Sequence, residues 1–255
     1  MSKFFKILLT LVIVSFFYYP FNPYFVPARY NTKLMLAIAG LIICIFYLLK
    51  NRSTFPKNIV PIFLYAGGVS LVSIAALTWN NTADNSYVTY IASMAVWFSA
   101  AFVTCTVIKA MHGKIDIPLL CNYLIAISVF QCFCALLIDH FPAFQTFVDT
   151  RVVRGMAFMH DINRLYGIGA GLDTAGIHFS LCLIMIAYLI KTRKSELSSW
   201  DIFLYVASFI IIAAIGSMIA RTTYVGIALA AGYLVIATSY SIKLSSDTVR
   251  TLLII

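Results

Sequence analysis

IPLLCNYLIAISVFQCFCALLI, residues 117–138, is a run of 22 residues without a charged side chain. A transmembrane helix needs about 20 consecutive apolar residues. Similar runs of 16 to 22 residues recur along the whole chain, and of its 255 residues 62% are hydrophobic and 11% charged, with a mean hydropathy of +0.95. Soluble domains are about half apolar and a quarter charged. The sequence therefore predicts an integral membrane protein without a separate soluble domain.

The predicted fold class is all-α, a polytopic transmembrane helix bundle of eight or nine helices that forms one membrane domain over residues 1–255. Beside 117–138, the expected helices cover 4–19, 34–49, 59–77, 87–108, 173–190, 200–219 and 224–242, with a ninth beginning at 251–255. Residues 139–172 are expected to form an outer loop. The first helix lacks the small-residue cleavage site of a signal peptide, so we expect it to be retained.

Lys and Arg residues decide the orientation of these helices. A cytoplasmic N-terminus puts 12 of the 18 basic residues on the inner side and makes every inner loop positive, as the positive-inside rule requires. The opposite orientation violates that rule. Topology thus explains the net charge of +9 without a nucleic-acid partner.

The basic residues expected outside differ in type from those inside. They are Arg29, Lys33, Arg151, Arg154, Arg164 and Arg221, whereas the inner twelve are nine Lys and three Arg. The planar guanidinium of Arg suits phosphate and carboxylate oxygens. Because outer basic residues oppose the topology rule, we interpret them as functional. Anchoring to lipid phosphates is the simpler alternative, as is snorkelling for Arg221.

Two outer segments carry these arginines. The first, RVVRGMAFMHDINRLYGIGAGLDTAGIHFSL at 151–181, also holds His160, Asp173 and His178. Its glycines suggest an irregular approach to the helix at 173–190, for which Asp173 or Thr174 would serve as N-cap. The second, IGSMIARTTYVGI at 215–227, surrounds Arg221 with small residues that allow close helix packing.

Other polar groups favour structural roles. Asn122 and Gln131 lie inside the run at 117–138, where amides usually bond a neighbouring helix. All six cysteines fall in apolar runs and are interpreted as packing residues, not as a disulfide framework or a metal site. No carboxylate lies in the middle of an expected helix, which argues against a proton-coupled transporter.

The two arginine segments resemble the O-antigen polymerase and O-antigen ligase superfamily of bacterial envelope enzymes. The resemblance covers roughly residues 120–240 and rests on short motifs. They are Arg164-Leu-Tyr-Gly167, Asp173-Thr-Ala-Gly176 with His178, Gly216-Ser217 with Arg221, and Gln131 before the outer loop.

The resemblance implies a multi-pass protein of the bacterial inner (cytoplasmic) membrane that acts as a metal-independent glycosyltransferase without an organic cofactor. Its substrate would be a glycan linked to undecaprenyl diphosphate, and membrane lipids would surround it. Arg221, then Arg164, then Arg154 would hold the diphosphate, with Asp173 and Gln131 in support. His160 and His178 are candidates for the base, although neither matches the family's histidine.

The resemblance also implies further helices and a large outer loop beyond residue 255. A truncated chain that is inactive on its own is therefore one alternative to an active enzyme. Two alternative functions remain open. A transporter or flippase for lipid-linked sugars would bind the same diphosphate without chemistry, and a membrane protein remnant would have no enzymatic function.

Overall fold

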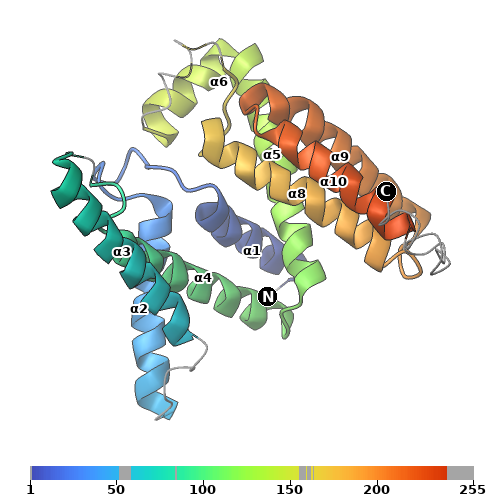
Figure 1. Cartoon of the computed structure of the whole chain (residues 1–255). Helices are drawn as coiled ribbons and strands as arrows, with labels where there is room; N and C mark the ends of the chain where they lie inside the picture. Colours follow the sequence, from blue (N-terminus) through green and yellow to red (C-terminus); the bar gives the residue numbers. More distant parts are fainter. Residues whose placement is uncertain are drawn as a thin grey trace, which may run out of the picture. The chain divides into compact units, whose positions relative to one another are not determined.

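The computed structural model describes residues 2–51, 59–83, 85–154, 159, 162 and 164–239, and within them the chain forms helices and no strand. The elements are α1 (Lys3–Tyr18), α2 (Thr32–Asn51), α3 (Val60–Asn80), α4 (Tyr90–His112), α5 (Ile117–His140), α6 (Pro142–Phe147), the π-helical turn η2 (Val148–Val152), α8 (Leu172–Thr192), α9 (Ser199–Ile219) and α10 (Thr223–Ser239) (Figure 1). The all-helical prediction is confirmed.

Six of these helices, α2, α3, α4, α5, α8 and α9, are long and apolar enough to cross a membrane. The described chain is therefore that of a multi-pass membrane protein. Two other expected spans are shorter, since α1 has 16 residues and α10 has 17. At 1.5 Å per residue such helices measure about 25 Å, less than the roughly 30 Å hydrocarbon core. The end of the expected helix 224–242 and the ninth helix at 251–255 lie outside the described residues.

The chain divides into two compact units, Met1–Ile115 and Asp116–Ile255. In the first, α2 crosses α4 closely, because a Cβ placed at Gly40 would overlap the backbone oxygen of Ser99. In this first unit, Arg29 and Lys33, both expected outside, have aromatic partners. The Lys33 ammonium lies 3.7 Å from the ring centre of Trp97, and the Arg29 guanidinium 5.0 Å from that of Tyr30. Cation–π attraction to these rings gives both basic side chains a local structural role.

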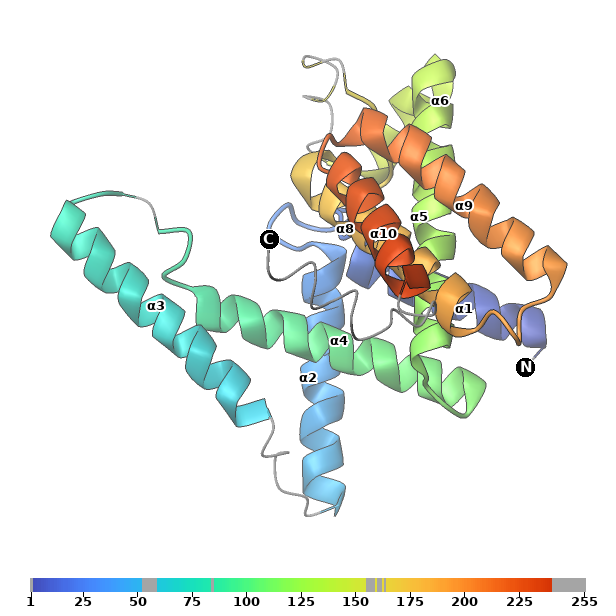
Figure 2. The same ribbon diagram turned by 45° about the vertical axis from the view of Figure 1, so that its right-hand side comes forward.

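In the second unit, α8 packs against α9 and α10 through small residues (Figure 2). A Cβ at Gly226 of α10 would overlap the backbone of Ser180 in α8, and one at Gly216 of α9 would lie 3.1 Å from the Phe179 ring. Gly216 and Gly226 therefore allow the close packing that the sequence predicts. Without a hydrophobic driving force in lipid, such backbone proximity is how membrane helices gain contact.

Interhelical hydrogen bonds add to this packing. The Tyr205 hydroxyl of α9 donates to Asn122 Oδ1 of α5 over 2.7 Å, which confirms the structural role predicted for Asn122. The Ser180 hydroxyl of α8 donates to the carbonyl oxygen of Thr222 over 2.9 Å. None of the six cysteines, all of which the structure describes, forms a disulfide, and Cys182 Sγ lies 3.1 Å from the Ser128 hydroxyl between α8 and α5.

The segment expected as an outer loop, 139–172, differs from the prediction in two respects. First, α5 continues to His140, and α6 with η2 adds helical backbone up to Val152. Pro142 opens α6, a position where its missing N–H costs nothing. Second, the N-cap of α8 is Gly171, so the predicted capping by Asp173 or Thr174 is wrong. The helix begins one residue before Asp173, and Gly171 has no side chain with which to cap it.

Candidate functional site

The arginines predicted to lie outside, in the second unit, gather at one end of it. Figures 1 and 2 show the C-terminal end of α5, the short helix α6, the N-terminal end of α8 and the turn between α9 and α10 at the same end. Arg151, Arg154, Arg164 and Arg221 lie in these connections. We call this set of elements the arginine end. The opposite end carries Lys191 in the last turn of α8, and Arg193 and Lys194 directly after it.

Arg221 is held at the arginine end by the packing of its turn. Gly176 in the second turn of α8 lies so close to Ala220 and Thr222 that a Cβ would overlap both. The backbone carbonyl of Arg221 accepts from the N–H of Tyr224 over 3.1 Å as α10 begins. The Arg221 side chain is exposed. An exposed guanidinium on a fixed backbone is suited to bind an anion from outside the helices.

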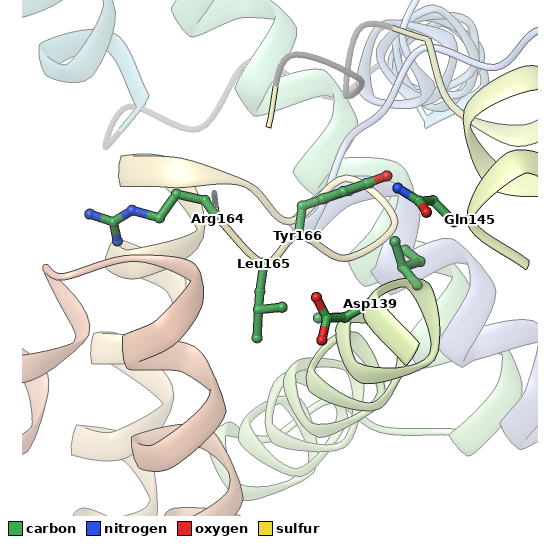
Figure 3. Close-up of a pocket in the computed structure, with 7 residues that line it drawn as sticks. Asp139, Gln145, Arg164, Leu165 and Tyr166 are labelled. Atoms are coloured by element: carbon green, nitrogen blue, oxygen red, sulfur yellow. The ribbon is translucent and has the colours of Figure 1, made fainter. Parts of the chain in front are cut away.

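Arg164 lines a cavity of about 200 Å³ between α5 and the loop that precedes α8. The other lining residues are Ala135, Ile138 and Asp139 from α5, Gln145 from α6, and Leu165 and Tyr166 from the loop. Figure 3 shows the Arg164 and Tyr166 side chains extending in opposite directions from the loop, with the Asp139 carboxylate beside the Leu165 side chain. The cavity therefore has a cationic rim at Arg164 and an anionic group at Asp139.

Tyr166 fastens this loop to the helical segment after α5. Its hydroxyl donates to the two carboxylate oxygens of Asp149 over 2.9 and 2.8 Å, and its side chain points toward Gln145 (Figure 3). Tyr166 is only 2% exposed. Burial, and next the hydrogen bond to Asp149, raise the pKa of the Tyr166 phenol well above its usual value. The phenol therefore stays protonated and keeps its donor role.

Gln131 lies beneath the same loop. It is 1% exposed in α5, and its Oε1 atom has no hydrogen-bond partner among the described residues. A Cβ at Gly167 would lie 2.5 Å from that oxygen, so the loop backbone approaches Gln131 in a way that only glycine permits. The loop is closed by the Gly167 N–H, which donates to the Ala170 carbonyl over 2.8 Å. Gln131 thus faces this loop.

The remaining predicted site residues differ in burial and in whether the structure describes them. His178 is 8% exposed, on the buried face of α8 with Ala175, Phe179 and Cys182, whereas Thr174 is exposed. A buried imidazole is poorly placed to meet a hydroxyl arriving from solvent. Arg154 is partly buried after η2. His160 lies outside the described residues. The backbone of Asp173 belongs to the first turn of α8, and its side chain lies outside the description.

Four residues of this region were not predicted as site residues from the sequence: Asp139, Gln145, Asp149 and Tyr166. Asp139 directly follows an apolar run, and Tyr166 is two residues from Arg164. The sequence position of each could therefore have marked it as a candidate. Gln145 and Asp149 had no such signal, because they reach the site only through the fold of α6 and η2. Within the described residues, no group of three or more His, Cys, Asp or Glu side chains could hold a metal ion.

Comparisons with known proteins found no counterpart. No protein-family model, no curated protein and no solved structure matches the chain. The fold and the site define the class, a multi-pass helical membrane protein with an arginine-bearing end. The function must be argued from that end.

Proposed function

We propose that the protein is a polymerase- or ligase-like glycosyltransferase that acts on glycans linked to undecaprenyl diphosphate. It would work at the outer face of a bacterial cytoplasmic membrane, with its N-terminus in the cytoplasm. The observation that carries the proposal is the gathering of Arg151, Arg154, Arg164 and Arg221 at one end of the second unit, beside a polar cavity.

A lipid-linked diphosphate fits this end chemically. Guanidinium groups bind phosphate oxygens through paired, charge-assisted hydrogen bonds. A diphosphate attached to a polyprenyl chain would stay at headgroup level, where connections between membrane helices lie. Arg221 and Arg164 would reach the same headgroup from two sides, since the turn of Arg221 packs on α8 and the loop of Arg164 leads into it.

The proposed reaction transfers the glycan to an acceptor. The acceptor hydroxyl oxygen forms a bond to the anomeric carbon, the bond from that carbon to the diphosphate oxygen breaks, and the hydroxyl proton is released. Negative charge develops on the leaving diphosphate. Arg221 and Arg164 would stabilise that charge, an effect worth about 100-fold or more in rate for one well-placed donor.

Reconstitution of the full chain with a radiolabelled lipid-linked oligosaccharide in proteoliposomes tests the proposal. We expect longer glycans on a gel, and loss of this product in Arg221→Ala. Arg193→Ala is the matched control, because Arg193 lies at the opposite end of the unit and pairs with Glu196 over 2.8 Å. Glycan that crosses the bilayer without growing would favour the transporter instead. Growth that is equal in Arg221→Ala and the wild type would reject the assigned role of Arg221.

A further inference from the structure

The cavity beside Arg164 has two chemically different sides. Leu165 supplies the apolar part of the accessible lining, because Ala135 and Ile138 are almost fully buried, whereas Asp139 and Gln145 supply a carboxylate and an amide. The Tyr166 hydroxyl on this wall donates to Asp149 and also has a hydrogen bond with the Gln145 side chain. The Asp139 carboxylate has the exposed His140 as neighbour, with Nδ1 3.3 Å from Oδ2. A carboxylate accepts about four hydrogen bonds, so Asp139 keeps capacity to accept from a ligand.

This combination selects a ligand with hydroxyl groups. A carboxylate only accepts hydrogen bonds, whereas an amide both donates and accepts, and hydroxyls satisfy both. The Leu165 side chain suits the C–H face of a ring. Pockets for drug-sized molecules measure about 300–1,000 Å³, so a cavity of about 200 Å³ has room for one small ring. An anionic group would be repelled by Asp139.

We infer that this cavity binds the first sugar ring attached to the diphosphate, and that Asp139 selects a neutral ring over an acidic one. The inference rests on the proposed function, because it takes the lipid-linked glycan as the ligand. The geometry separates the two parts of that ligand. Arg164 extends to one side of Leu165 and Asp139 lies on the other (Figure 3), so the diphosphate meets the cation while the ring enters the cavity.

Binding of three lipids to the full chain in nanodiscs tests the inference. The probes are undecaprenyl diphosphate, the same lipid carrying one glucose, and the same lipid carrying one glucuronic acid. We expect the glucose to tighten binding about tenfold, the effect of a hydrogen bond to a charged group. The glucuronic acid should give no such gain. Asp139→Ala should remove the gain from glucose and should not weaken the binding of undecaprenyl diphosphate, because it removes a negative charge.

Glu196→Ala is the matched control, because Glu196 is an exposed carboxylate at the opposite end of the unit. It should keep the full gain from glucose. Equal affinity for the lipid with and without glucose overturns the inference while leaving diphosphate binding intact. A gain that persists in Asp139→Ala overturns it as well. Failure of the wild-type chain to bind any of the three lipids overturns the proposed function itself.

Discussion

Replacing Tyr166 by Phe removes one hydroxyl group and leaves the ring in place. That hydroxyl donates to both oxygens of Asp149 and so joins the loop at 164–170 to η2. A hydrogen bond to a charged partner is worth about 1.5–3 kcal/mol. The loop should therefore open more readily, and its backbone amides, among them the Gly167 N–H, should exchange with solvent about 10- to 100-fold faster.

Hydrogen exchange followed by mass spectrometry on peptides from 164–170 measures this effect. Tyr224→Phe is the matched control, because Tyr224 lies in the same unit and is 60% exposed. It should leave the exchange rate of the loop unchanged. Exchange in Tyr166→Phe that equals the control would refute the reasoning that the Tyr166–Asp149 bond holds the loop over the cavity.

Three further predictions follow from the same packing and hydrogen bonds. The pKa of Tyr166 is raised in the folded protein, so its hydroxyl contributes fully to stability below the unfolded tyrosine pKa of about 10. That contribution is lost as the pH rises further. The melting temperatures of the wild type and Tyr166→Phe should therefore differ below that pH and converge above it. Gly226→Leu should destabilise the protein by about 1–3 kcal/mol, because the new side chain would overlap Ser180. Gly232→Leu is the control and should not destabilise it, because a Cβ at this position of the same helix has no atom within 4 Å. Unfolding in mixed micelles measures both variants. Tyr205→Phe should cost about 0.6–1.7 kcal/mol in the same assay, because it removes the bond to Asn122, and a cost of zero would contradict that bond.

The helices could be predicted from the sequence because hydropathy over about 20 residues is a strong local signal. Even α5, expected at 117–138, ends only two residues later, at His140. The segment after it was harder, because α6 and η2 are short and their sequence has no apolar run of membrane length. Local pattern placed the start of α8 within one residue but assigned the wrong N-cap, which is Gly171 and not Asp173 or Thr174.

Only the arginines of the candidate site could be predicted from the sequence, because their charge alone identifies them. Arg164 and Arg221 stand out because they oppose the positive-inside rule. The partners of the cavity do not, because the contact between Tyr166 and Asp149 joins residues 17 apart that come together only when the loop folds back on η2. The same holds for Gln131 and Gly167, whose proximity depends on the path of the loop over α5.

The central claim is that the arginine end faces the outer side of the membrane. Thr150 lies in η2 at this end and Lys194 lies at the opposite end, and both are exposed. Labelling of Thr150→Cys and Lys194→Cys with a membrane-impermeant maleimide in intact cells measures their sides directly, with the wild-type cysteines as background. We predict that Thr150→Cys is labelled in intact cells and Lys194→Cys only after lysis. The reverse pattern would contradict the account.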